Sequence, residues 1–275
     1  MVLALGIYFS IAIGVGDFFG AYLARRVHSF TAVITFLGIG GLTALLMMIA
    51  VESQFAAGNA GLGAAGGLTV GFALVLLYHG MAVSSAAVVS PVTAVITALI
   101  PVGWDIGTGG SLAGWVIVGI AIALAGLAVT TFSPELGDRA LAGVRWGLAS
   151  GTCFGISLTL IGQTDIDSGL WATVFQRFAA FAVLGALAVV RRIPWFVPTA
   201  LLRPGLIGGV LTGSGVAAFV AGSQRGTLSE ITVTASMSPA VTVVLAAVFE
   251  KHPFRWWQGI GLATVVGGVI LIGLG

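Results

Sequence analysis

Two ionisable residues lie inside long apolar runs of this chain, and they are the first candidates for chemistry. Asp17 occurs in IGVGDFFGAY and Arg177 in VFQRFAA. A charged side chain at the centre of a membrane helix costs about 2.5–3.5 kcal/mol on insertion scales. We therefore expect Arg177 to hold an anion, either an acidic group of a bound solute or the Asp17 carboxylate. A permanent structural ion pair between the two residues is the alternative.

Uncharged polar side chains in or beside the same runs can line a polar cavity with this pair. His79, in LLYHGM, can titrate near neutral pH or hydrogen-bond a solute, but a histidine there can equally be a satisfied packing residue. The residues that we predict to bind solute are Asp17, Tyr78, His79, Ser90, Gln163, Arg177, Ser214 and Ser238. Further lining candidates are Tyr22, Gln176, Gln224 and Glu230, of which the last two can also be caps at the membrane surface.

Two apolar runs contain a Ser-Pro pair at corresponding positions. Ser90-Pro91 and Ser238-Pro239 each interrupt an apolar run. A proline inside a helix removes a backbone donor and clashes with the preceding turn. A membrane tolerates this only where hydroxyls, neighbouring helices or a cavity satisfy the freed carbonyl. We predict that both helices bend at Pro91 and Pro239 and border one central cavity; prolines that only shape packing are the alternative.

The residue types of familiar enzyme sites do not cluster in this sequence. It has no glycine-rich phosphate loop, a single cysteine (Cys153) and three histidines, two of which fall in connections. One cysteine excludes an intrachain disulfide. We expect no enzymatic activity, no catalytic residue, no metal, no cofactor and no nucleic-acid partner.

Composition sets the fold class. Hydrophobic residues make up 58% of the chain and charged residues 7%, with a mean hydropathy of +1.13, whereas soluble domains carry roughly 25% charged residues. The apolar runs do not alternate as the strands of a membrane barrel do. An all-α integral membrane protein is therefore predicted. At about 20 residues per span, the runs give ten transmembrane helices near residues 3–23, 30–51, 62–82, 85–102, 111–132, 143–163, 169–190, 204–223, 228–249 and 256–274.

The polar segment SPELGDR divides the chain into two halves of five spans each, residues 1–133 and 139–275. Features recur in the same order in both halves, among them the Ser-Pro pairs and two Gly-x6-Gly segments, Gly119/Gly126 and Gly261/Gly268. An odd number of spans requires the second half to enter the membrane from the opposite side. The sequence therefore predicts two inverted five-helix repeats.

Glycine recurs every fourth residue in two stripes, at Gly143, Gly147, Gly151 and Gly155 and at Gly205, Gly209 and Gly213. Such stripes let helix backbones approach closely. They are interpreted either as contacts that slide during a conformational change or as static packing.

These features resemble the drug/metabolite transporter superfamily, in particular its EamA-like members, over essentially the whole chain. The resemblance rests on the order of the prolines Pro91 and Pro239 and of the two Gly-x6-Gly segments over ten spans. The second half matches better. It keeps Glu250 after the proline-bearing helix and Arg177 early in its second helix, whereas the first half has Asp105 and Thr35-Phe36 at these places.

The resemblance implies a secondary carrier that moves small metabolites through a cavity between the repeats, with both termini in the cytoplasm. The distribution of charge implies the opposite orientation. Even-numbered connections hold one basic residue, Arg225, and odd-numbered ones hold Arg25, Arg26, Arg139, Arg145, Arg191, Arg192, Arg203, Lys251 and Arg255. Because basic residues stay in the cytoplasm, this count places both termini outside.

Together these features predict a secondary transporter that exports or exchanges a small organic metabolite by alternating access. Its expected partners are the solute and the lipid bilayer, in the plasma (inner) membrane of a prokaryote, and the sequence leaves its oligomeric state open. A membrane-embedded enzyme or a lipid-handling scaffold is the alternative. Either would need a clustered nucleophile, metal set or basic headgroup pocket.

Overall fold

A computed structural model describes residues 1–109, 114–131, 137–225, 237–250 and 255–273. Over these residues the chain is helical and contains no strand. Its ten α-helices are α1 (Val2–Ala24), α2 (Ser29–Met47), α3 (Ala57–Val83), α4 (Ala86–Gly107), α5 (Gly114–Thr131), α6 (Asp138–Ile161), α7 (Trp171–Val190), α8 (Leu202–Ser223), α10 (Ser238–Glu250) and α11 (Trp256–Gly273). Two short 3₁₀ helices, Ile166–Ser168 and Thr199–Leu201, precede α7 and α8.

Seven of these helices are long and apolar enough to cross a membrane: α1 to α4, α6, α7 and α8. Three shorter apolar helices span Gly114–Val129, Ser238–Phe249 and Trp256–Ile272 within the described residues. The apolar runs of the sequence thus give the predicted helices, with ends displaced by a few residues. The first half of the span predicted at 228–249 lies outside the described residues.

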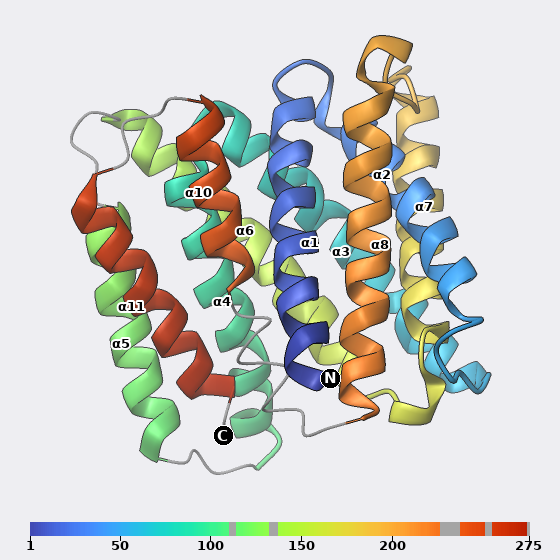
Figure 1. The fold of residues 1–275 in the computed structure, drawn as a ribbon, viewed down its shortest axis with the longest axis horizontal. Helices are drawn as coiled ribbons and strands as arrows, with labels where there is room; N and C mark the ends of the chain where they lie inside the picture. The colour runs from blue at the N-terminus through green and yellow to red at the C-terminus, as the bar shows by residue number, and fades with distance from the viewer. Residues whose placement is uncertain (110–113, 132–136, 226–236, 251–254, 274–275) are drawn as a thin grey trace.

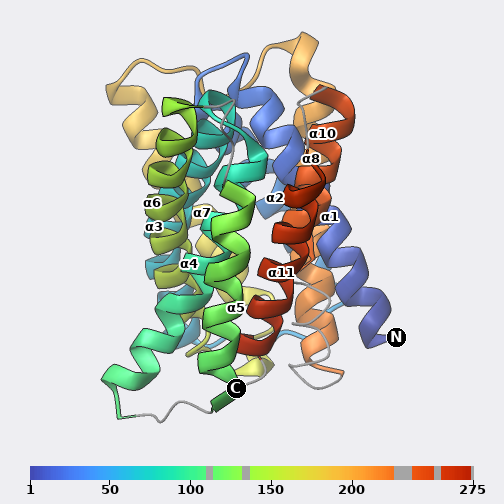
Figure 2. The same ribbon diagram turned by 90° about the vertical axis from the view of Figure 1, so that its left-hand side faces the viewer.

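The helices run side by side along one direction, with both chain termini at the lower end of the bundle (Figure 1). Helix α8 packs on α1 and α2, and α3 packs on α6 and α7. Helix α4 packs on α6, and α5 pairs with α11 at one side of the molecule (Figure 2). The centre of the bundle is therefore bordered by elements from both halves of the chain.

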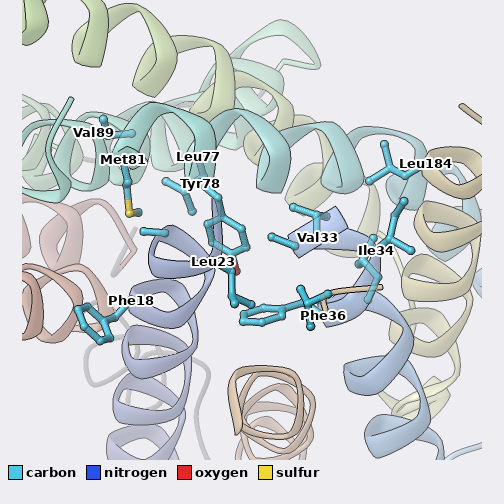
Figure 3. Packing of buried hydrophobic residues seen from close by; sticks show 14 of the residues in the cluster. Phe18, Leu23, Val33, Ile34, Phe36, Leu77, Tyr78, Met81, Val89 and Leu184 are labelled. Carbon is cyan, nitrogen blue, oxygen red and sulfur yellow. The ribbon is translucent and has the colours of Figure 1, made fainter. Parts of the chain in front are cut away.

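The largest buried cluster joins α1, α2 and α3. Its fully buried members include Leu23, Phe36, Leu37, Tyr78 and Met81. Figure 3 shows Tyr78 and Phe36 side by side in this cluster, and their ring centroids lie 5.8 Å apart with the planes tilted by 75°. This edge-to-face arrangement is the favoured one for two aromatic rings, and it fixes the direction in which the Tyr78 hydroxyl points.

Glycines make the helix contacts close. A Cβ atom at Gly119 would lie 2.9 Å from the Gly268 carbonyl oxygen, and one at Gly126 would lie 2.7 Å from that of Gly261. The two Gly-x6-Gly segments therefore face each other, and because the first glycine of one meets the second of the other, α5 and α11 are antiparallel. At such positions a side chain would separate the helices.

Both glycine stripes are packing surfaces. The α6 stripe runs along α4, where Cβ atoms at Gly147, Gly151 and Gly155 would lie 2.5–2.7 Å from side-chain Cβ atoms of that helix. The α8 stripe runs along α2, where Gly209 meets Ile39. Static close packing accounts for both stripes, and sliding along them stays a prediction.

Polar contacts close the lower end of the bundle. The Asn59 amide donates to an Asp165 carboxylate oxygen at 3.0 Å, and the Leu170 backbone N–H donates to the Ser53 hydroxyl at 3.0 Å. The Gln224 amide donates to the Glu52 carbonyl at 2.8 Å. Gln224 is thus a cap that ties the end of α8 to the α2–α3 connection, and Glu230 lies outside the described residues.

Candidate functional site

A buried hydrogen bond joins α1 to α3. The Tyr78 hydroxyl donates to a carboxylate oxygen of Asp17 at 3.1 Å. Tyr78 is fully buried, and its ring occupies the space that a side chain at Gly20 would fill. The absence of a Cβ at Gly20 is therefore what lets the aromatic ring reach across to α1. Among the described residues Tyr78 is the hydrogen-bond partner of the Asp17 side chain, and no cation pairs with this carboxylate.

Arg177 enters the same region from α7 and is 9% exposed. Its Nη2 donates to the carbonyl oxygen of Thr212 on α8 at 3.1 Å. A Cβ atom at Gly40 of α2 would lie 2.8 Å from Nη1, so this glycine makes room for the guanidinium. The Nε atom is buried without a hydrogen-bond partner in the part of the chain that the structure describes. Buried donors are nearly always satisfied, so this atom marks a place for a further acceptor.

Thr212 on α8 contacts both α1 beside Asp17 and the guanidinium of Arg177. Its methyl group fills the space beside Gly16, the residue before Asp17, while its carbonyl accepts from Arg177. Within the described residues no ion pair joins Asp17 to Arg177, because each is bonded to a neutral group instead. The permanent ion pair, which was the alternative to solute binding, is therefore not present between these two residues in the structure. The structure leaves a carboxylate and a guanidinium in one buried region, neither neutralised by the other.

His79 points away from this region. Its Nδ1 lies 3.4 Å from the hydroxyl of Ser29, at the start of α2, and its ring packs edge-on against Trp146 with the centroids 4.8 Å apart. Trp146 lies two turns inside α6, which begins at Asp138. His79 is thus held by packing near the ends of α2 and α3.

Ser214 and Gln163 also lie apart from the Asp17 and Arg177 side chains. The Ser214 hydroxyl donates to the Val210 carbonyl and shares a 2.8 Å hydrogen bond with the hydroxyl of Tyr8, near the start of α1. Gln163 is exposed in the turn after α6, and its amide donates back to Thr159 at 3.2 Å.

The Ser-Pro pairs are placed differently in the two halves. Ser90 and Pro91 are buried within α4, which continues through the proline to Gly107. Ser238 and Pro239 are the first two residues of α10 and are half-buried, and residues 226–236 before them lie outside the described residues. Burial of Pro91 fits the prediction that it faces the bundle, and the predicted bends stay predictions.

The second half of the sequence is similar to a known protein family. Residues 141–274 match the model of the EamA-like transporter family. The second half of the chain is thus similar to this family. EamA-like transporters are part of the drug/metabolite transporter superfamily, and this match together with the apolar helices shows an integral membrane protein. Arg177 and Thr212 both lie within the EamA-like half.

The fold comparison extends over the first half as well. One solved crystal structure aligns with 96% of this chain and 94% of its own, with a TM-score of 0.62 and 16% sequence identity. At that identity the likeness shows the fold alone. No curated protein sequence matches the chain.

Two contributors to the candidate site were not predicted from the sequence. Thr212 acts through its carbonyl, and Gly40 acts by having no side chain, so a search for polar side chains finds neither. The local signal for both is the density of small residues, in LGIGG around Gly40 and in GGVLTGSG around Thr212. Within the described residues no group of three or more His, Cys, Asp or Glu side chains is placed to hold a metal ion.

A chain of two hydrogen bonds starts at Gln176, the residue next to Arg177. Gln176 donates through Nε2 to the Ser157 hydroxyl at 2.8 Å, and that hydroxyl donates to the Gly66 carbonyl at 2.9 Å. Gln176, predicted as a lining group, therefore ties α7 to α6 and α3. These two hydrogen bonds fix the helix turn from which Arg177 projects.

Replacing Tyr78 by Phe should lower the free energy of unfolding by about 1–3 kcal/mol, because the buried Asp17 carboxylate loses its hydrogen-bond donor. Thermal unfolding in detergent measures this change. Tyr8→Phe is the matched control: it also removes one hydroxyl, but Ser214 keeps its bond to Val210, so the expected cost is smaller. Combining Tyr78→Phe with Asp17→Asn should recover part of the loss. Equal stabilities of Tyr78→Phe and Tyr8→Phe would contradict a stabilising role for the hydrogen bond between Tyr78 and Asp17.

Proposed function

We propose that this protein is a ten-helix secondary transporter that exports or exchanges a small organic metabolite by alternating access. The observation that carries the proposal is the buried Arg177 guanidinium, with an unmet donor, in a protein whose second half is EamA-like. Arg177 anchors an acidic group of the solute, and the Asp17–Tyr78 pair supplies a second polar surface. The transporter works in the plasma (inner) membrane of a prokaryotic cell.

Helix pairing supports two repeats, residues 1–133 and 139–275. In two repeats, α1 to α5 would correspond in order to α6, α7, α8, α10 and α11. Each helix pair in contact between the halves should then have an equivalent pair, obtained by replacing each helix with its counterpart in the other half. The equivalent of the α1–α8 contact is α6–α3, that of α2–α8 is α7–α3, and that of α1–α10 is α6–α4. The structure contains all six of these helix contacts. The antiparallel α5–α11 pair maps onto itself, as an inverted repeat requires.

Residue contacts repeat in the same way. Thr242 on α10 donates to the Gly14 carbonyl of α1 at 3.1 Å, and Thr93 on α4 donates to the Gly147 carbonyl of α6 at 3.4 Å. Each proline-bearing helix thus holds the first helix of the other half through a threonine hydroxyl. These contacts divide the bundle into two similar units, α1 with α2, α8 and α10, and α6 with α7, α3 and α4. The units can rock about the buried site between them.

Binding of the solute can be measured before transport. A panel of amino acids, carboxylates, sugars, sugar phosphates and nucleosides is added to the purified protein, and its melting temperature Tm is followed. We expect at least one acidic compound to raise Tm of the parent protein and of Arg225→Gln, which removes an exposed arginine. The same compound should not raise Tm of Arg177→Gln. A compound that stabilises the parent and Arg177→Gln equally would place its binding site elsewhere.

A further inference from the structure

One end of the bundle carries a dense set of exposed arginines. They lie at the ends of five helices, namely just after α1 and α7, in the first two turns of α6, in the first turn of α8 and just before α11, and these helix ends lie at the upper end in Figure 1. The exposed arginines of this end, which we call the arginine-rich end, are Arg25, Arg26, Arg139, Arg145, Arg191, Arg192, Arg203 and Arg255. The exposed carboxylate found there among the described residues is Asp138.

The opposite end has the reverse character. Glu52, Asp165 and Asp167 are exposed there, and Arg225 is its arginine within the described residues. Both chain termini lie at this end (Figure 1). The charges of the described residues are thus separated along the long axis of the helices.

The arginine side chains are held in a manner suited to a membrane surface. Arg26 lies over the Tyr22 ring, 3.6 Å from its centroid, and Arg25 donates to the Met81 carbonyl at 3.3 Å. Arg255 lies 5.1 Å from the centroid of Trp257, and the neighbouring Trp256 is 75% exposed. Guanidinium groups stacked on aromatic rings are cation–π contacts, and aromatic and basic residues are both typical of the headgroup region. A guanidinium also matches the geometry of a phosphate group.

The arrangement fits headgroups better than a solute. The arginines are spread over the ends of five helices instead of converging on one point, and they differ in this from the single buried guanidinium of Arg177. Anionic lipids concentrate in the cytoplasmic leaflet and attract basic segments beside the membrane. We propose that the arginine-rich end binds anionic phospholipid headgroups and is the cytoplasmic end, so that both termini face the other side of the membrane.

Lipid binding is tested in nanodiscs that contain either phosphatidylcholine alone or phosphatidylcholine with phosphatidylglycerol. Anionic lipid should raise Tm of the parent protein by about 3 °C or more, and 0.5 M NaCl should remove most of the rise because salt screens exposed charges. The quadruple variant Arg139→Gln, Arg145→Gln, Arg191→Gln, Arg203→Gln should lose the rise, whereas Arg225→Gln keeps it. No rise in the parent protein, or the same rise in the quadruple variant, would overturn the proposal.

Orientation is tested in cells with two reporters fused separately after Gly275. We expect alkaline phosphatase, which is active only outside the cytoplasm, to be active, and green fluorescent protein, which fluoresces only inside, to be dark. Fusions made in the connection after Val190, between Arg192 and Ile193, should give the opposite pattern. Inactive phosphatase and bright fluorescence at Gly275 would overturn the assigned orientation. This readout is independent of transport, so it stands whether or not a solute has been found.

Discussion

Transport by Arg177→Lys should fall at least about tenfold, and transport by Arg177→Gln about a hundredfold, while both variants still reach the membrane folded. Hydrogen bonds to a charged group contribute roughly 1.5–3 kcal/mol, and each 1.4 kcal/mol is about a factor of ten in binding. Lysine can still donate to the Thr212 carbonyl and so preserve the packing. It lacks the planar fork and the Nε donor that the proposal assigns to the solute.

The measurement is uptake of the solute into proteoliposomes, normalised to the amount of folded protein. Arg225→Gln removes a positive charge that is exposed at the end of α8, and it should transport like the parent protein. Arg177→Gln with parental transport rates would mean that the buried guanidinium serves packing alone. If neither Arg177 variant folds, the guanidinium is likewise needed for packing, and a lowered Tm of the variants would reveal this directly.

Gly63→Ala should lower the free energy of unfolding by about 3 kcal/mol, at the upper end of the usual cost of overpacking. A Cβ atom at Gly63 would clash with the backbone carbonyl of Ala172 and lie 2.9 Å from the Ala172 Cα. Backbone atoms cannot move aside as a flexible side chain can, so α3 and α7 would have to separate. Because α7 carries Arg177, transport should also be lost.

The same helix supplies a matched control. Gly61 lies two residues before Gly63 on α3, and a Cβ atom there would meet nothing within 4 Å. Gly61→Ala should leave Tm unchanged or raise it slightly, since alanine is a better helix former than glycine by up to about 1 kcal/mol. Equal melting temperatures of Gly61→Ala and Gly63→Ala would show that the α3–α7 contact is looser than the structure has it.

The helices of this fold are readable from sequence because each is a run of apolar residues of membrane length. Their pairing is not readable in the same way, because runs that are apolar on every side carry no stripe that tells which face meets a neighbour. Small residues are the exception. The Gly-x6-Gly segments and the glycine stripes, noted for their spacing, lie at the α5–α11, α6–α4 and α8–α2 contacts.

The candidate site was predictable in part. Asp17, Tyr78 and Arg177 stand out because polar groups are costly inside apolar spans, and the structure brings them into one buried region. The partner of Arg177 was not predictable, since it is the backbone carbonyl of Thr212, an acceptor that every residue has. Gln163 was placed inside a span and lies in a turn, because α6 ends two residues earlier, at Ile161.

The central claim is that a small organic solute crosses the membrane through the buried site at Arg177. Its most direct test is release from proteoliposomes loaded with a defined mixture of amino acids, carboxylates, sugars, sugar phosphates and nucleosides, with the external solution analysed by mass spectrometry. We expect the parent protein to release at least one acidic solute, faster when the same solute is present outside, and Arg177→Gln to release it at least about tenfold more slowly. Release of that solute at equal rates by the parent protein and Arg177→Gln would contradict the claim.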